Sequence, residues 1–141
     1  MNQARRGKDE LMLAPQAMTN SATVTANLDT KGSGHATIRI ALAAEINTNA
    51  VGPTIALSES DDTVVTNFGT VVATRTAEAI VAAKEVRYEV DIKGRKRYLR
   101  LSVTTGTTTN DNVTVSVIAT KTRNSEDPNS TTDMADVVVN A

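Results

Sequence analysis

The stretch VRYEVDIK, residues 86–93, decides the fold class because apolar and polar side chains alternate along it without a break. Its apolar side chains share one face of an extended chain: Val86, Tyr88, Val90 and Ile92. The stretch YLRLSV, residues 98–103, repeats the alternation. Residues 94–96 between the two stretches form a short connection that contains Gly94, and this spacing predicts a β-hairpin.

The same period of two recurs in four further segments, which are residues 22–28, 35–42, 54–60 and 113–120. The turn sequence KGSG at 31–34 joins the first two of them and predicts a second paired unit. Shorter apolar stretches follow at 64–68 and at 70–82. The alanine-rich part of 70–82 fits one or two strands better than the alternative of a helical turn or two.

These segments give about seven or eight short strands, each with one apolar face. Such strands bury their apolar faces most readily by packing one sheet on another, and the short connections favour antiparallel pairing. We therefore predict an all-β chain folded as an antiparallel β-sandwich. Aromatic residues make up only 2% of the 141 residues, so the core is expected to be thin and oligomerisation would help to stabilise it.

The pattern also predicts a division of the chain into three parts. Residues 21–122 form the sandwich, residues 1–20 form an irregular N-terminal arm, and residues 123–141 form a polar linker and tail. Each terminal part contains an apolar island that no predicted hairpin uses; these are Leu11, Met12 and Leu13, and Val137, Val138 and Val139. Arms of this kind fold back, hang free or add to a neighbour's sheet edge, so both islands are candidate partner-binding segments.

Composition argues against several classes of function. The 15 basic and 16 acidic residues nearly cancel, so no net field gathers nucleic acid or an anionic membrane. There is neither an apolar run long enough for a secretory signal nor one of about 18 residues that could span a bilayer. With no cysteine and a single histidine, His35, which the alternation places on a solvent-facing strand position, we predict no catalytic, cofactor or metal site.

Two polar features are further candidates for a site. Asp61 and Asp62 lie in an expected turn, and their spacing matches no calcium-binding loop. The dense basic cluster consists of Lys93, Arg95, Lys96, Arg97 and Arg100. It fits a solvated turn, a docking patch for acidic residues of a protein partner or, least well, a nucleic-acid contact, because Tyr98 is the one aromatic beside it.

Three stretches resemble a pattern found in the capsid cement or decoration proteins of tailed bacteriophages: LDTKGSGHATIRIAL (28–42), LSESDDTVVTNFG (57–69) and YEVDIKGRKRYLRLSVTT (88–105). Their order and spacing agree over residues 28–121. The resemblance implies a jelly-roll sandwich that forms a homo-oligomer, with a trimer favoured over a dimer. It also implies a place on the outer surface of the virion, where the protein binds across neighbouring major capsid protein subunits and stabilises the shell.

Two other functions compete with this one. A carbohydrate- or cell-surface-binding sandwich of a phage fibre is one, although such sites usually present exposed aromatic platforms. A structural protein of the tail or connector is the other, and the strand pattern does not distinguish it from a capsid protein. An enzyme is the reading with the least support.

Overall fold

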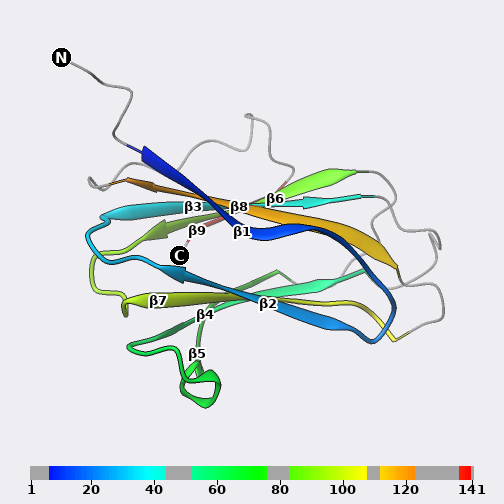
Figure 1. The fold of residues 1–141 in the computed structure, drawn as a ribbon, viewed down its shortest axis with the longest axis horizontal. Coiled ribbons are helices and arrows are strands. Elements are labelled where there is room, and N and C mark those ends of the chain that lie inside the picture. The colour runs from blue at the N-terminus through cyan, green and yellow to red at the C-terminus, as the bar shows by residue number, and fades with distance from the viewer. Residues whose placement is uncertain (1–6, 44–51, 76–82, 108–111, 123–136, 141) are drawn as a thin grey trace.

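The protein is described by a computed structural model at residues 7–43, 52–75, 83–107, 112–122 and 137–140. Two β-sheets pack face to face (Figure 1). The described residues contain nine strands and one 3₁₀ helix: β1 (Gly7–Met18), β2 (Thr23–Asp29), β3 (His35–Leu42), β4 (Thr54–Ser60), η2 (Val65–Asn67), β5 (Thr70–Arg75), β6 (Lys84–Asp91), β7 (Tyr98–Thr104), β8 (Val113–Thr122) and β9 (Val137–Asn140).

The strand order is that of a jelly roll. One sheet has the order β1-β8-β3-β6-β9 and the other has the order β2-β7-β4-β5. Strands β1 to β8 form nested antiparallel pairs, β1 with β8, β2 with β7, β3 with β6 and β4 with β5, as if one long hairpin had been rolled up. The ninth strand adds a parallel edge beside β6. The predicted all-β jelly-roll sandwich is therefore confirmed.

The two predicted hairpins are wrong, because consecutive strands cross from one sheet to the other. Strands β6 and β7 lie in different sheets, as do β2 and β3. Alternation tells which face of a strand is buried but not which strand lies beside it. The two crossing segments meet at one end of the sandwich, where the Thr30 amide donates to the Arg97 carbonyl (3.0 Å) and the Ile92 amide donates to the Gly34 carbonyl (3.0 Å).

The inward faces of both sheets form one aliphatic core. Its buried members include Leu28, Ile38, Ile40, Ile55, Leu57, Val86, Leu99, Leu101, Val115 and Val117. Tyr88 of β6 is fully buried among them and reaches across to the other sheet. Its hydroxyl donates to the Ile55 carbonyl (2.8 Å) and accepts from the Arg75 amide (3.1 Å). Burial raises the pKa of Tyr88 to about 12. One phenol therefore ties the two sheets together through polar contacts.

The N-terminal segment differs from the irregular arm that the sequence predicts. Residues 7–18 form β1, which pairs with β8 along its whole length. The register shifts between Leu11 and Leu13 and again between Leu13 and Gln16. These irregularities interrupt the alternation that reveals other strands, and the edge position tolerates Pro15.

The structure describes only parts of the remaining predicted segments. Strand β5 confirms a strand at 70–75, whereas 76–82 lie outside the described residues. The predicted stretch at 64–68 is occupied by the 3₁₀ helix η2 instead of a strand. Residues 137–140 form β9, whereas the polar linker at 123–136 lies outside the description.

Candidate binding surfaces

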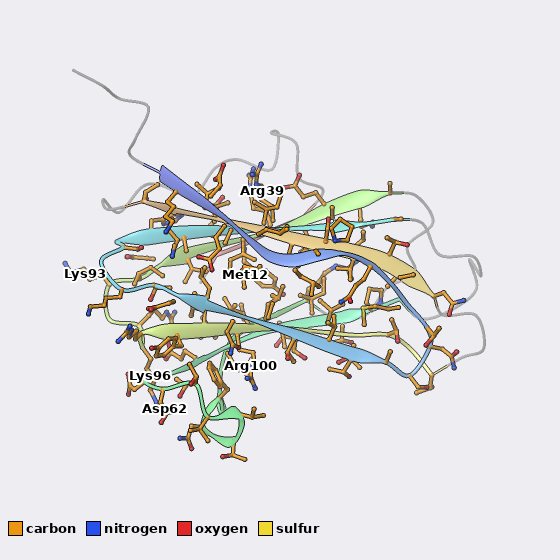
Figure 2. The ribbon with its side chains drawn as sticks, viewed as in Figure 1. Met12, Arg39, Asp62, Lys93, Lys96 and Arg100 are labelled. Carbon is orange, nitrogen blue, oxygen red and sulfur yellow. The ribbon has the colours of Figure 1, made fainter. Side chains whose placement is uncertain are left out.

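The basic cluster lies at the end of the sandwich where β6 passes into β7, and Figure 2 shows Lys93 and Lys96 at this end. Arg97 is held by β2, because its Nε and Nη2 donate to the two Asp29 oxygens at 3.0 Å and 2.9 Å. Its guanidinium also lies 4.9 Å from the centre of the Tyr98 ring. Arg97 is therefore used inside the protein, to fasten the two crossing segments to each other.

Arg100 is also engaged within the chain. Its guanidinium stacks on Phe68 at 4.3 Å and its Nε donates to Asn27 Oδ1 at 2.9 Å. By contrast, the side-chain nitrogens of Lys93 and Arg95 have no partner within the described ranges, and both residues are at least partly exposed. The predicted cluster thus divides into two structural arginines, an outward-facing pair of Lys93 and Arg95, and the partly buried Lys96, whose charge helps to lower the pKa of Asp62.

We expect the Asp29–Arg97 pair to give a small acid sensitivity. The Arg97 hydrogen bonds hold the pKa of Asp29 at about 2, below its usual 3.8. The pair therefore stabilises the fold fully above pH 4, and this stability is lost as the pH falls towards 2. Both side chains are 44% exposed, so solvent screening limits the contribution to less than about 1 kcal/mol. Urea unfolding of wild type and Asp29→Asn at pH 7 and pH 2.5 checks this, and equal losses on acidification in both proteins would contradict it.

The loop between β4 and β5, residues 61–69, projects from the lower side of the molecule (Figure 1). We call it the corner loop. Asp62 organises it: Oδ1 accepts from the Val64 amide (2.9 Å), and both carboxylate oxygens accept from Asn67 Nδ2 (3.1 and 2.9 Å). The Val64 amide is the main cause of the lowered pKa of Asp62. The loop is therefore built by its own hydrogen bonds.

Three valines around this loop face solvent. Val64 and Val65 at the start of η2 are 53% and 67% exposed, and Val71 of β5 is 60% exposed. We call these three side chains the valine patch. The sequence predicts a short apolar stretch at 64–68 and does not indicate that its valines face solvent. The Asp61-Asp62 turn shortly before the two valines is the sequence feature that argues against a strand at this place.

A hollow of about 130 Å³ lies on the outer face of the five-stranded sheet. Its lining comes from three adjacent strands: Arg39, Ala41, Glu85, Ser116 and Ile118. Ile118 is 38% exposed and is paired by register with Leu11 of β1, which is 59% exposed. Sequence analysis gave no indication of the hollow, because it arises from small side chains on neighbouring strands that are far apart in the chain.

A buried charged cluster occupies the same sheet near the start of β3. Glu89 Oε2 lies 2.7 Å from His35 Nε2 and accepts from Thr37 Oγ1 at 2.9 Å, while Glu89 Oε1 lies 3.0 Å from Arg87 Nε. His35, Arg87 and Glu89 are all buried. The predicted exposure of His35 to solvent is therefore wrong. Alternation does place His35 on the outer face of the sheet, but its side chain is buried there beside Glu89.

The two predicted partner-binding islands lie on opposite edges of the five-stranded sheet, in β1 and β9. Met12 and Leu13 pack against the core, and Figure 2 shows Met12 between the sheets, so Leu11 is the exposed member of its island. Val137, Val138 and Val139 are paired with Val86, Arg87 and Tyr88. The structure does not bring the two islands together. It also brings neither of them to the end of the sandwich that carries the basic cluster.

No group of three or more His, Cys, Asp or Glu side chains within the described ranges is placed to hold a metal ion. The described part of the chain also contains no helix with the length and apolar character needed to span a bilayer.

Comparison with known proteins gives a likeness of fold. No protein-family model and no curated protein matches the chain. It is similar to the K3 cleaved adhesin domain of Lys-gingipain from Porphyromonas gingivalis, with a TM-score of 0.51 and 13% identity over 71% of this chain and 63% of that one. It is also similar to the enzymatically active domain of tailspike protein 4 from bacteriophage CBA120, with a TM-score of 0.51 and 8% identity over 82% of this chain and 19% of that one.

A VP2 subviral particle structure of infectious bursal disease virus aligns with a TM-score of 0.48 and 12% identity, over 84% of this chain and 33% of that one. The chain thus spans less than two thirds of each of these three structures. At such low identities the similarity to the two structures with a TM-score of 0.51 shows the β-sandwich fold and nothing about activity.

Proposed function

We propose that this protein is a structural component of a tailed-phage virion that binds across neighbouring major capsid protein subunits on the outer surface and stabilises the shell. The observation that carries the proposal is the distribution of exposed groups. Outward-facing cations gather at the β6–β7 end, which fits contact with the shell, and apolar side chains gather at the corner loop and beside the hollow, which fits contact between copies. Surfaces of this kind mark contacts with other proteins. The jelly-roll order and the sequence resemblance over residues 28–121 support the same proposal.

The mechanism needs no chemical step. A protein that binds the assembled lattice more tightly than free subunits shifts the equilibrium towards the lattice by that difference in affinity. A homo-oligomer, which we propose to be a trimer, makes its second and third contacts at high effective concentration. Modest contacts at each copy then add up to durable binding.

The positions of the aromatic side chains argue against a carbohydrate-binding site. The chain has one Phe, two Tyr and no Trp. Tyr88 is buried in the core, while the rings of Phe68 and Tyr98 lie beneath the guanidinium groups of Arg100 and Arg97. A guanidinium therefore lies over each of the two rings outside the core, which leaves the chain little aromatic surface for stacking on a sugar.

We expect the double variant Lys93→Glu/Arg95→Glu to bind shells about tenfold more weakly than wild type, because it repels acidic groups that the basic end would contact. Co-sedimentation with shells assembled from the major capsid protein of the same genome, at two salt concentrations, measures this. Lys8→Glu reverses an exposed cation on β1 and is the matched control. Unchanged binding of the double variant would remove the basic end from the interface. Equal affinity of wild type for shells and for free subunits would refute the proposed function.

A further inference from the structure

We propose that the corner loop of one copy docks into the hollow on the outer face of the five-stranded sheet of a second copy, so that the copies join head to tail. The inference rests on the proposed function, because it names the contact that builds the proposed homo-oligomer. It concerns contacts between copies, whereas the basic end concerns contacts with the shell.

Among the residues whose side-chain burial the structure describes, the large exposed apolar side chains lie in two places. Val64, Val65 and Val71 form the valine patch, while Ile118 lines the hollow and Leu11 is its neighbour across the β1–β8 pair. One contact between the two places would cover every one of them. Apolar surface that solvent contacts in the separated chain favours such an association.

The two places differ in shape in a way that fits them to each other. The valine patch lies on a projecting loop, whereas the hollow is recessed and lined by the small side chains of Ala41 and Ser116 beside Ile118. A hollow of about 130 Å³ has room for a branched side chain of three carbons. The corner loop is already held by Asp62 and by the stacking of Phe68 on Arg100, so docking orders little additional chain.

The charges beside the two places are also complementary. Asp61 is exposed in the same loop as Val64, and its carboxylate has no partner among the described residues. The hollow is lined by one anion and one cation, Glu85 and Arg39, and Arg39 forms no ion pair within the same ranges. A contact between copies would bring an unpaired carboxylate towards an unpaired guanidinium.

The arrangement excludes contact within one copy. Figure 2 shows Asp62 of the corner loop beyond the four-stranded sheet and Arg39 beyond the five-stranded sheet, so the loop and the hollow lie on opposite sides of the sandwich. A contact between two different surfaces is heterologous, and it builds a closed ring when the rotation between copies closes. A trimer is one such ring.

The test uses one variant on each side of the contact. Val65→Asp places a charge on the loop, and Ile118→Asp places a charge in the hollow; each is expected to weaken self-association at least tenfold, measured by sedimentation velocity. Mixed in equal amounts, the two variants should form a heterodimer and nothing larger, because the intact hollow of the first meets the intact loop of the second. Ala41→Gln, which fills the hollow without adding charge, serves if Ile118→Asp does not fold.

Thr25→Asp adds the same charge to the outer face of the four-stranded sheet at β2 and should leave self-association unchanged. A wild-type chain that stays monomeric at all accessible concentrations, or a mixture of the two variants without heterodimer, would overturn the inference. Shell co-sedimentation separates this result from failure of the proposed function, since a monomer that still prefers assembled shells leaves that function standing.

Charge exchange tests the proposed pair of Asp61 and Arg39. Asp61→Arg and Arg39→Asp are each expected to weaken self-association several-fold. The chain that carries both changes should regain wild-type association, because every contact again joins one cation to one anion. A double variant weaker than either single variant would contradict the head-to-tail pairing.

Discussion

Replacing Tyr88 with alanine is expected to lower the free energy of unfolding by about 3–5 kcal/mol, as large-to-small changes of buried aromatic residues do. Tyr88 is fully buried and is the large ring at the centre of an otherwise aliphatic core. The change would leave a cavity between two sheets that small side chains cannot fill. Urea unfolding followed by circular dichroism measures the loss.

Tyr88→Phe is the matched control because it keeps the ring and removes the hydroxyl. It takes away the donor to the Ile55 carbonyl and the acceptor for the Arg75 amide, both in the opposite sheet. A loss of about 1–3 kcal/mol is expected from these two contacts. If alanine costs no more than phenylalanine, packing of the ring is not what Tyr88 contributes.

The strands could be predicted from sequence wherever alternation was uninterrupted. Most of the stretch 86–93 and all of 113–120 were predicted correctly, with β6 ending at Asp91, because a strand with one face on the core must alternate. Strand β1 could not be read in this way, since its register shifts beside Leu13 place residues out of phase. The alternation also could not predict which strands pair, because a jelly roll pairs segments as distant in the sequence as β1 and β8.

The candidate surfaces were less predictable than the fold. Sequence adjacency showed the basic cluster, but the partner of Arg97 is Asp29, 68 residues away. The corner-loop valines resemble strand residues in the sequence. The structure shows instead that the loop held by Asp62 contains a 3₁₀ helix and exposes them to solvent. The hollow joins residues of three strands, and its position depends on a register that no single segment specifies.

The buried charged cluster gives the second large expected effect. Glu89→Ala should lower the free energy of unfolding by about 3–5 kcal/mol, because it removes the anion from a buried pair and leaves the cationic partner in place. Glu89 contacts the imidazole of His35, the hydroxyl of Thr37 and the guanidinium of Arg87 at once. Its loss therefore disturbs β3 and β6 together. Urea unfolding at pH 7 measures the effect.

Glu85→Ala is the matched control, because it removes a carboxylate four residues away on the same strand. Glu85 faces the same side of β6 but is only partly buried, so its replacement should change stability by less than about 0.5 kcal/mol. Glu89→Gln should fall between the two, since it keeps an oxygen to accept hydrogen bonds from Thr37 and loses the charge that pairs with Arg87. If Glu89→Ala proves as mild as Glu85→Ala, the cluster is open to water in solution and does not hold β3 against β6.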